Sequence, residues 1–359
     1  MPVFPDKLHR QIFFGDDALS HLENFLSKKY PGVQKFILTD ENTTVHCLPV
    51  LLKHIPALEN ATVLSMKSGE KNKNLSSCID IWNQLNAGGA MRNSLLLNLG
   101  GGVLCDTGGF SASVYLRGID FIHIPTTLLS MADSSIGGKT GIDLDGLKNR
   151  VGTFAFPQAV VTYPLFLKTL PQREINAGFA EIIKQALLAG EKLWTMVKQV
   201  EPGANKIPEK IISETLLFKA GIVAEDPYEK GRRAIFNFGH TIGHSIETCS
   251  LVHHEDSLRH GEAVAAGMIG ALHLCTALEN FPKELSEEIS SIIKAWFPWL
   301  RVDFTDDQIM SHIRFDKKKT GKPLRFILLK KIGEPVITEK VTEENIRSAI
   351  GFARSYLLK

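Results

Sequence analysis

Residues 94–106 read SLLLNLGGGVLCD, and this stretch contains the clearest indication of the fold. The leucine-rich run is typical of a buried β-strand, and three glycines, Gly100 to Gly102, follow it directly. Glycines after a buried strand allow the backbone to approach a ligand closely and to present N–H groups to a pyrophosphate. The spacing differs from the GxGxxG fingerprint, so this turn taken alone is as often structural as functional.

Short β-rich runs alternate with helical patterns on both sides of this stretch, as they do in βαβ units. Strands are expected at residues 36–38, 61–66 and 121–124. A helix is expected between the second strand and residue 94, with an apolar face formed by Leu75, Ile79, Trp82 and Leu85. The first half of the chain therefore predicts a Rossmann-like α/β domain with a parallel sheet that binds a nucleotide.

The pattern changes near residue 170. Helices are expected at residues 175–189, 207–225, 239–249 and 261–278, with few strand signals until a short strand at 324–331. A length of 359 residues also favours two domains. We expect a nucleotide-binding α/β domain at residues 1–170 and a mainly α-helical metal- and substrate-binding domain at residues 171–359.

Composition excludes several classes of protein. A formal net charge of +2 does not suggest a polybasic nucleic-acid surface, and five scattered cysteines without a CxxC pair argue against a disulfide framework or a thiolate zinc site. Residues 1–14 carry prolines and charges, unlike a signal peptide. The most apolar helix, residues 263–278, contains His273 and falls short of the ~20 residues that a membrane span needs. We expect a reduced, soluble, cytoplasmic protein that binds neither nucleic acid nor membranes.

A polar stretch after the strand at 121–124 suits a phosphorylated polyol. It contains the adjacent hydroxyls of Thr126 and Thr127, then Asp133, then Lys139 in a Gly-Gly-Lys-Thr turn. The lysine would hold a phosphate as a point charge, and the aspartate would accept hydrogen bonds from sugar hydroxyls. Arg117 and the pair Lys148 and Asn149 add two cations and an amide. The alternative is a capped, glycine-rich surface loop.

Histidine spacing in the second half indicates a metal site. His240 and His244 are four residues apart on an expected helix, so both imidazoles point to the same side. His260 begins another helix and offers a third imidazole, with Glu262 close by. Three nitrogen or carboxylate ligands with one open position form the catalytic zinc pattern, and the absence of HExxH argues against a metalloprotease. On spacing alone, both His240 and His244 are candidate ligands.

Further charged residues in the helical half have two interpretations. Glu181 and Lys184 lie three residues apart and share a helix face, which is more often a solvated surface ion pair than part of a site. The same alternative applies to Lys219, Glu229 and Arg233.

With these residues assembled, nearly the whole chain resembles the 3-dehydroquinate synthase family of sugar-phosphate cyclases. The motifs that carry the resemblance occur in the family's order and are GGGVLCDTGGF, YLRG, PTTLL, DSSIGGKTGI, LKNRVGTF, AEIIK, NFGHTIGHSIE, HGEAVAAGM and FDKKKTGK. The resemblance implies a phosphate-eliminating lyase of the shikimate pathway. Its substrate would be 3-deoxy-D-arabino-heptulosonate 7-phosphate, and its products 3-dehydroquinate and phosphate. The steps would be transient oxidation by NAD, phosphate elimination, re-reduction and intramolecular aldol closure.

The resemblance also implies roles for individual residues. Zn²⁺, with Co²⁺ as the alternative, would be held by Glu181, His240 and His260, while His244 would lie behind the ligands or contact the substrate. The other residues assigned to catalysis are Lys139, Lys184, Lys219, Arg233 and Asn237. Those assigned to the substrate are Arg117, Asp133, Lys148, Asn149, Glu229, Lys317 and Lys318. NAD would contact Asp40, Asn42, Glu70, Lys73, Gly101, Gly102, Asp106, Thr126, Thr127, Lys139, Lys148 and Thr169.

The expected assembly is a homodimer in which Arg117 reaches the phosphate from the partner subunit. Two other functions remain open. Another sugar-phosphate cyclase would act on sedoheptulose 7-phosphate or glucose 6-phosphate, but Lys219 and Asn237 match the dehydroquinate pattern and count against it. A metal-dependent polyol dehydrogenase would need fewer cations, because its substrates usually lack phosphate.

Overall fold

The computed structural model describes residues 11–145, 147–320 and 324–358, apart from the side chains of residues 315–320. Two compact units are present, one formed by Met1–Pro171 with Pro208–Tyr228 and the other by Gln172–Ile207 with Glu229–Lys359. Helix α8 (Glu209–Glu225) lies in the second of the two segments of the first unit, although the domain expected at residues 171–359 includes it. It joins that unit because Leu216, Ala220 and Val223 form a hydrophobic cluster with Ile136 and Val160.

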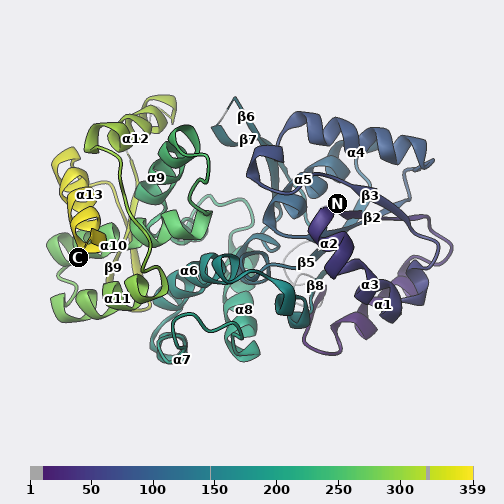
Figure 1. The fold of residues 1–359 in the computed structure, drawn as a ribbon, viewed down its shortest axis with the longest axis horizontal. Coiled ribbons are helices and arrows are strands. Elements are labelled where there is room, and N and C mark those ends of the chain that lie inside the picture. The colour runs from purple at the N-terminus through teal and green to yellow at the C-terminus, as the bar shows by residue number, and fades with distance from the viewer. Residues whose placement is uncertain (1–10, 146, 321–323, 359) are drawn as a thin grey trace. The chain divides into compact units, whose positions relative to one another are not determined.

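A six-stranded parallel sheet forms the centre of the first unit (Figure 1). Its strands, in spatial order, are β1 (Ile12–Phe14), β8 (Val160–Thr162), β5 (Asp120–Pro125), β4 (Leu95–Gly100), β2 (Lys35–Thr39) and β3 (Thr62–Ser65). The Rossmann-like α/β fold is therefore confirmed. All six residues of β4 are buried, as expected for a parallel strand that is covered on both faces.

Helices cover the two faces of this sheet (Figure 1). The helices of the unit besides α8 are α1 (Ala18–Lys29), α2 (Glu41–His46), α3 (Leu48–His54), α4 (Leu75–Ala87) and α5 (Gly102–Val114). The crossovers that contain α1 and α3 run toward the β3 edge of the sheet, whereas those that contain α4 and α5 run toward the β1 edge. Because crossovers between parallel strands are right-handed, the two pairs of helices lie on opposite faces of the sheet, and within each pair the helices are in contact. The expected apolar face of α4 is partly wrong, since Leu75 and Ile79 are exposed while Cys78, Ile81 and Leu85 are buried.

The strand order creates a switch point between β2 and β4. After β2 the chain moves outward to β3, and after β4 it moves the other way to β5 and then β8. The carboxyl ends of two such neighbouring strands border a crevice, which is where open α/β sheets bind nucleotides. An antiparallel hairpin of β6 (Lys139–Leu144) and β7 (Leu147–Phe154) completes the first unit.

The second unit is mainly helical. It contains α6 (Gln172–Ala189), α7 (Glu191–Val197), α9 (His240–His253), α10 (His260–Glu279), α11 (Lys283–Trp296), α12 (Asp306–Thr320) and α13 (Glu343–Leu358), with an antiparallel pair of β9 (Phe326–Lys331) and β10 (Glu334–Thr338). Helix α10 is the central element and packs against α6, α9, α11, α13 and β9. The expected fold class, in which a mainly helical domain accompanies the α/β domain, is confirmed by these segments.

Helix α10 is longer than the sequence indicates. Its 20 residues, which include an apolar window of mean hydropathy 1.4, satisfy the length and composition of a membrane span, so the expectation that it would be too short is wrong. However, 78% of its most hydrophobic window is buried, so its apolar side chains pack in the core of the second unit. The five cysteines all lie among the described residues, and they are buried and unpaired.

Glycines on α10 allow neighbouring helices to approach closely. A Cβ at Gly261 would lie 1.9 Å from the carbonyl oxygen of Ala177 on α6, and a Cβ at Gly267 would lie 2.1 Å from the carbonyl oxygen of Gly239. No side chain fits at these distances, so α10 packs backbone to backbone against α6 and the start of α9. This contact positions the charged residues described next.

Candidate metal and nucleotide sites

Glu181 on α6 is a carboxylate in the interior of the second unit. Its side chain is fully buried, and neither oxygen makes a hydrogen bond of ordinary geometry to any described residue. Lys184, one helical turn further on and equally buried, forms an ion pair with it. The pair is therefore not the solvated surface ion pair that is the usual alternative for this spacing. Lys184 also lies 5.7 Å from the ring centre of Phe236.

Two imidazoles face this carboxylate. The Nε2 atoms of His240 and His260 lie 3.6 Å and 3.4 Å from Oε1 of Glu181. On the far side of each ring, Nδ1 lies against an acceptor: the carbonyl oxygen of Phe238 at 3.1 Å for His240, and Oε2 of Glu247 at 3.2 Å for His260. Because Nδ1 of each ring lies against an acceptor, Nε2 is the nitrogen that a metal ion beside Glu181 would bind.

His244 joins the same cluster. One ring nitrogen from each of His240, His244 and His260 can be chosen so that all three lie within 4.8 Å of one another. His244 is the exposed member of the three, whereas His240 is buried. The spacing-based prediction that His240 and His244 point to one side is thus confirmed, although the geometry leaves open whether His244 is a ligand.

The charges of the cluster follow from its surroundings. Burial favours the neutral form of Glu181, but Lys184 and His260 outweigh this and lower the pKa of Glu181 to about 2. Burial, followed by the nearby charge of Lys184, lowers the pKa of His240 well below its usual range. Burial also opposes the charged form of His260, but Glu247 and Glu181 raise the pKa of His260 to about 10.

The donor set fits a divalent metal ion. Zn²⁺ takes imidazole nitrogens and carboxylate oxygens, and a metal-binding histidine usually donates its other N–H to a carboxylate or a backbone carbonyl. Both features occur here, in Glu181, His240 and His260 with their acceptors Phe238 and Glu247. Lys184 pairs with Oε2 of Glu181, but Oε1, which faces both imidazoles, has no hydrogen bond of ordinary geometry among the described residues. A buried oxygen of this kind is costly unless a further positive charge meets it.

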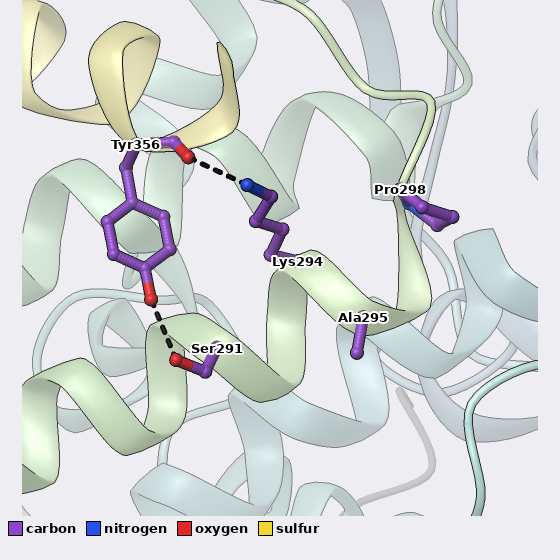
Figure 2. A pocket seen from close by; sticks show the side chains of 5 residues that line it. All are labelled: Ser291, Lys294, Ala295, Pro298 and Tyr356. Atoms are coloured by element: carbon purple, nitrogen blue, oxygen red, sulfur yellow. Dashed lines mark hydrogen bonds between the residues drawn. The ribbon is translucent and has the colours of Figure 1, made fainter. Parts of the chain in front are cut away.

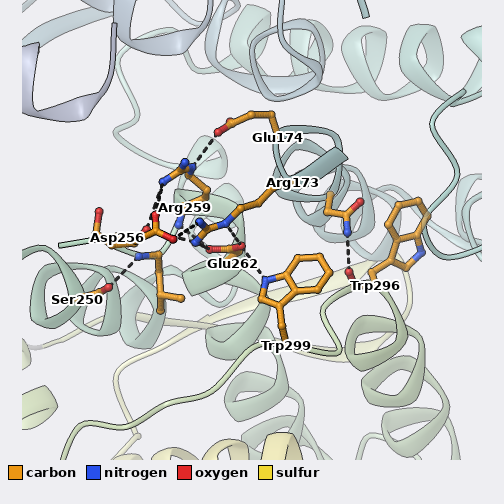
Figure 3. Close-up of polar contacts among 11 residues, drawn as sticks. Arg173, Glu174, Ser250, Asp256, Arg259, Glu262, Trp296 and Trp299 are labelled. Carbon is orange, nitrogen blue, oxygen red and sulfur yellow. Dashed lines mark hydrogen bonds and ion pairs between the residues drawn. The ribbon is translucent and has the colours of Figure 1, made fainter. Parts of the chain in front are cut away.

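Glu262 is turned away from the imidazoles. Its carboxylate is held by the guanidinium of Arg173, at 2.7 Å and 2.9 Å, and by the indole N–H of Trp299, at 3.0 Å (Figure 3). It also accepts the backbone N–H of Arg259, which caps α10. Glu262, although close to His260 in sequence, therefore belongs to a structural network.

A second polar group of this unit lies just before α9. Nδ2 of Asn237 donates to Oε1 of Glu229 at 3.2 Å, and Nε of Arg233 lies 3.8 Å from Oε2 of the same carboxylate. Arg233 is buried. The structure thus brings together Glu229, Arg233 and Asn237, which are all predicted site residues. Because Arg233 is buried, the alternative of a solvated surface charge does not hold for it.

In the first unit, the buried side chain of Lys73 is the centre of a polar cluster. Its Nζ lies 2.7 Å from Oδ2 of Asp106 and 2.7 Å from Oδ1 of Asn149. Burial opposes the charge, but Asp106 and Glu70 outweigh it and raise the pKa of Lys73. Glu70 forms a further ion pair with Lys148 at 2.9 Å. Five predicted site residues are therefore neighbours.

The remaining predicted NAD contacts in this unit lie mostly at the carboxyl edge of the sheet. Asp40 follows β2, where Oδ1 accepts the N–H of Thr43 and caps α2, and Asn42 is exposed on that helix. Gly101 and Gly102 follow β4, and a Cβ at Gly101 would lie 3.0 Å from Cγ2 of Thr127. The N–H of Thr126, after β5, donates to Gly100.

Asp133 and Lys219 form a contact that the sequence does not reveal. Nζ of Lys219 on α8 lies 2.7 Å from both Oδ2 and the carbonyl oxygen of Asp133, which lies in a π-helical turn, η6 (Ser130–Ser134). Lys219 is buried, so it is not the solvated surface charge that is the alternative interpretation of this residue.

Three further predicted site residues belong to this unit. Lys139 is exposed at the start of β6, Arg117 is exposed on a turn with a φ of 70°, and Thr169 ends a short helix where its hydroxyl donates to Phe166. The side chains of Lys317 and Lys318 lie outside the described residues.

A surface pocket of about 540 Å³ lies elsewhere in the second unit (Figure 2). It is lined by Ser291, Lys294, Ala295, Pro298 and Tyr356, and the hydroxyls of Ser291 and Tyr356 are 2.8 Å apart. None of the predicted site residues lines it. Its walls carry no cluster of metal-binding groups, and we do not assign it to the chemistry.

Sequence reasoning missed two residues beside the candidate metal site. Glu247 lies seven residues after His240 and three after His244 on α9, so the same helical periodicity that pairs the histidines could have included it. Arg173 had no such signal, because its partner Glu262 is far away in the sequence.

Comparison with known proteins agrees with this geometry. Residues 63–177 match the N-terminal domain of 3-dehydroquinate synthase and residues 178–319 match its C-terminal domain. A 3-dehydroquinate synthase of Parabacteroides distasonis is 41% identical over 349 residues, which cover 96% of this chain and 98% of the relative. One from Dehalococcoides mccartyi is 37% identical and covers 95% of each chain.

Solved structures give the same fold. A 2-deoxy-scyllo-inosose synthase complexed with carbaglucose-6-phosphate, NAD⁺ and Co²⁺ has a TM-score of 0.82 at 26% identity, covering 94% of this chain and 96% of the other. A 2-epi-5-epi-valiolone synthase from Streptomyces hygroscopicus, with NAD⁺ and Zn²⁺ bound, has a TM-score of 0.78 at 25% identity and covers 90% and 91%. An iron-containing alcohol dehydrogenase shares only the fold, with a TM-score of 0.68 at 14% identity and 99% of each chain covered.

A Rossmann-like unit with a switch point in its sheet, together with a helical unit that carries a carboxylate and imidazole cluster, defines the fold of the sugar-phosphate cyclases. Within that class, the chain belongs to the 3-dehydroquinate synthase family.

Proposed function

We propose that this chain converts 3-deoxy-D-arabino-heptulosonate 7-phosphate to 3-dehydroquinate and phosphate, with NAD and a divalent metal ion as cofactors. The observation that carries the proposal is the buried carboxylate of Glu181 facing Nε2 of His240 and His260, in a chain 41% identical to a named 3-dehydroquinate synthase. The net reaction is an elimination and ring closure, so NAD is regenerated in each turnover.

The metal ligands in this proposal are Glu181, His240 and His260, and the metal is Zn²⁺ or Co²⁺. The relatives of known structure carry Zn²⁺ or Co²⁺ beside NAD⁺, which supports both ions. When bound, the metal polarises an alcohol oxygen as a Lewis acid, and NAD accepts a hydride and returns it. His244, the exposed imidazole of the cluster, contacts the substrate.

NAD lies at the switch point of the parallel sheet. The strands β2, β4 and β5 are neighbours in the sheet, and Asp40, Gly101 and Thr127 follow their carboxyl ends. These positions support the proposal. At the start of α5, Gly101 and Gly102 lie close against Thr127 and Ser134, and the N-terminus of the helix favours a pyrophosphate. Asp40, or another carboxylate at this edge, accepts hydrogen bonds from a ribose.

Cations hold the phosphate and the developing negative charge. Lys139, Lys184, Lys219 and Arg233 serve this purpose together with the amides of Asn149 and Asn237. Three of the four cations are buried, where a charge interacts more strongly than it does in water. Asp133 positions Lys219 through the contacts of 2.7 Å described above. Positioning and charge stabilisation are therefore the main contributions of the protein.

Another sugar-phosphate cyclase activity is the main rival. The likeness to 2-deoxy-scyllo-inosose synthase and 2-epi-5-epi-valiolone synthase supports it, but these structures are only 26% and 25% identical to the chain. Lys219 and Asn237 follow the dehydroquinate pattern and favour the first proposal. A polyol dehydrogenase has support from the fold alone.

We propose a cytoplasmic homodimer in which Arg117 reaches the phosphate of the partner subunit. The exposed position of Arg117, on a backbone turn with φ of 70°, is compatible with a contact outside its own chain. Light scattering measures the mass in solution. Mixing an Arg117→Ala subunit with a Glu181→Gln subunit should restore activity only if a site takes residues from both.

The deciding experiment measures phosphate release from 3-deoxy-D-arabino-heptulosonate 7-phosphate with NAD and Zn²⁺ while absorbance at 340 nm is recorded. Stoichiometric phosphate without a lasting NADH signal is the expected result. No phosphate from this substrate, but release from sedoheptulose 7-phosphate or glucose 6-phosphate, would support the rival cyclases. NADH that accumulates with a simple polyol would support the dehydrogenase.

A further inference from the structure

We propose that Glu247 is a positioning residue that fixes the ring orientation and tautomer of His260, so that Nε2 of His260 is the metal-binding atom. The inference rests on the proposed metal site of Glu181, His240 and His260. It concerns a side chain that neither histidine spacing nor the family resemblance assigned to the site.

The contact is direct and buried. Oε2 of Glu247 lies 3.2 Å from Nδ1 of His260, and the Glu247 side chain is 3% exposed. A carboxylate can only accept hydrogen bonds, so once a metal ion takes Nε2, the remaining proton of the His260 ring sits on Nδ1 and is donated to Glu247. The lone pair is then on Nε2, which lies 3.4 Å from Oε1 of Glu181.

Helix packing explains why Glu247 meets His260. A Cβ at Gly239 would touch Met268, and a Cβ at Gly243 would lie 3.0 Å from the carbonyl oxygen of Ala263, so α9 and α10 run in opposite directions in close contact. One further turn along α9 comes Glu247, opposite the first turn of α10. His260 is the residue found there.

His240 is oriented in the same way by a different group. Its Nδ1 lies 3.1 Å from the backbone carbonyl of Phe238, and its Nε2 faces the same oxygen of Glu181. Each proposed imidazole ligand thus has one acceptor behind it, supplied by the backbone for His240 and by a side chain for His260. Only the second can be removed by substitution.

Glu247 is not placed as a metal ligand. It contacts Nδ1, whereas Glu181 lies beside Nε2 of the same ring. An ion bound at Nε2 lies on the other side of the imidazole from the Glu247 carboxylate. The effect of Glu247 on the metal therefore passes through His260, as outer-shell acceptors behind metal-binding histidines generally act.

Zinc affinity, measured by competition with a fluorescent chelator, tests the proposal in the full-length protein. Glu247→Gln leaves only an uncharged, weaker acceptor behind His260 and should weaken zinc binding about 10- to 100-fold, the usual effect of mutating such an outer-shell partner. Glu247→Asp should recover part of the affinity because it restores the charge on a shorter side chain. The Co²⁺-loaded protein gives a second measurement, since its visible absorption should change in Glu247→Gln.

Glu174→Gln is the matched control. Glu174 accepts a hydrogen bond from Nε of Arg259 at 2.8 Å, next to His260 in sequence, and no contact with an imidazole is recorded for it among the described residues. Its loss should leave both zinc affinity and the cobalt spectrum unchanged. Equal weakening in both variants would mean that any lost carboxylate near α10 has this effect, and would overturn the assignment.

A measurement on the unsubstituted protein makes the test independent of whether the variants fold. Nitrogen-15 NMR of the zinc-loaded protein should show the His260 proton on Nδ1, and a proton on Nε2 would overturn the proposal. Wild-type protein that binds no zinc would instead refute the metal site itself. Zinc binding that is identical in wild type and Glu247→Gln would refute only the part assigned to Glu247.

Discussion

Arg173 and Glu262 form a two-point contact, with Nε to Oε1 at 2.7 Å and Nη2 to Oε2 at 2.9 Å. Arg173 lies in the first turn of α6, which carries Glu181, and Glu262 lies in the first turn of α10, which His260 begins. The carboxylate is fully buried. This contact therefore connects α6 and α10, the two helices that place Glu181 and His260 next to each other in the candidate metal site.

Arg173→Ala should destabilise the protein strongly. It leaves Glu262 buried without its charged partner, which typically costs about 3–5 kcal/mol. Because the Arg173 side chain is 30% exposed, we expect a value near the lower end. Urea denaturation gives the change in the free energy of unfolding.

Arg314→Ala is the control for the loss of an arginine. The ion pair of Arg314 with Glu343 is about half exposed on both sides, and exposed pairs contribute little to stability because solvent screens them. Losses of similar size in the two variants would show that Glu262 does not depend on Arg173.

Gly261→Ala should disrupt the approach of α10 to α6. The new Cβ would lie 1.9 Å from the carbonyl oxygen of Ala177, so the helices must separate, and overpacking of this kind costs about 1–3 kcal/mol or more. Gly221→Ala on α8 has open space and should instead stabilise by about 0.5–1 kcal/mol. Thermal denaturation compares them, and a tolerated Gly261→Ala would contradict the close packing.

His260→Ala should lose the metal and the phosphate-releasing activity while the fold survives. The imidazole is one of three proposed ligands, and it lies partly exposed at a helix start rather than in the core. Metal content is measured by mass spectrometry after dialysis, and the fold by circular dichroism. Metal retained at full stoichiometry would refute the assignment of this ligand.

Stability at acid pH should depend on His123. Burial lowers the pKa of His123 from 6.5 to about 3, so between these pH values the unfolded chain binds a proton that the native protein does not. The free energy of unfolding must then fall as the pH drops from 6.5 toward 3, by up to about 1.4 kcal/mol per pH unit for one proton.

His123→Gln should remove this contribution and make the pH dependence shallower. Urea denaturation at several pH values between 4 and 6.5 measures both slopes. The substitution also alters a contact of 3.3 Å with Asn98, so the comparison concerns the slope and not the absolute stability. Parallel slopes would show that His123 does not titrate as a buried neutral group.

Much of the architecture follows from local sequence patterns. The leucine run of β4, the glycines after it and the long apolar periodicity of α10 all indicate their elements directly. Strands β1 and β8 were not expected, because three residues carry too little pattern and only pairing in the sheet defines them. Helix α8 belongs to the first unit because its apolar face packs against Ile136 and Val160. The periodicity of α8 predicts an apolar face but does not indicate which unit that face contacts.

For the candidate site too, some features follow from the local sequence and others only from the tertiary structure. Spacing along one helix is local, so the sequence by itself determined that His240 and His244 share a side, and the motifs determined the family. Only the tertiary structure decided that Glu181, Lys184, Lys219 and Arg233 are buried rather than solvated, and that Glu247 lies behind His260 while Glu262 faces Arg173. Burial and contact between distant segments depend on how helices pack, and packing is a property of the whole chain rather than of any one segment.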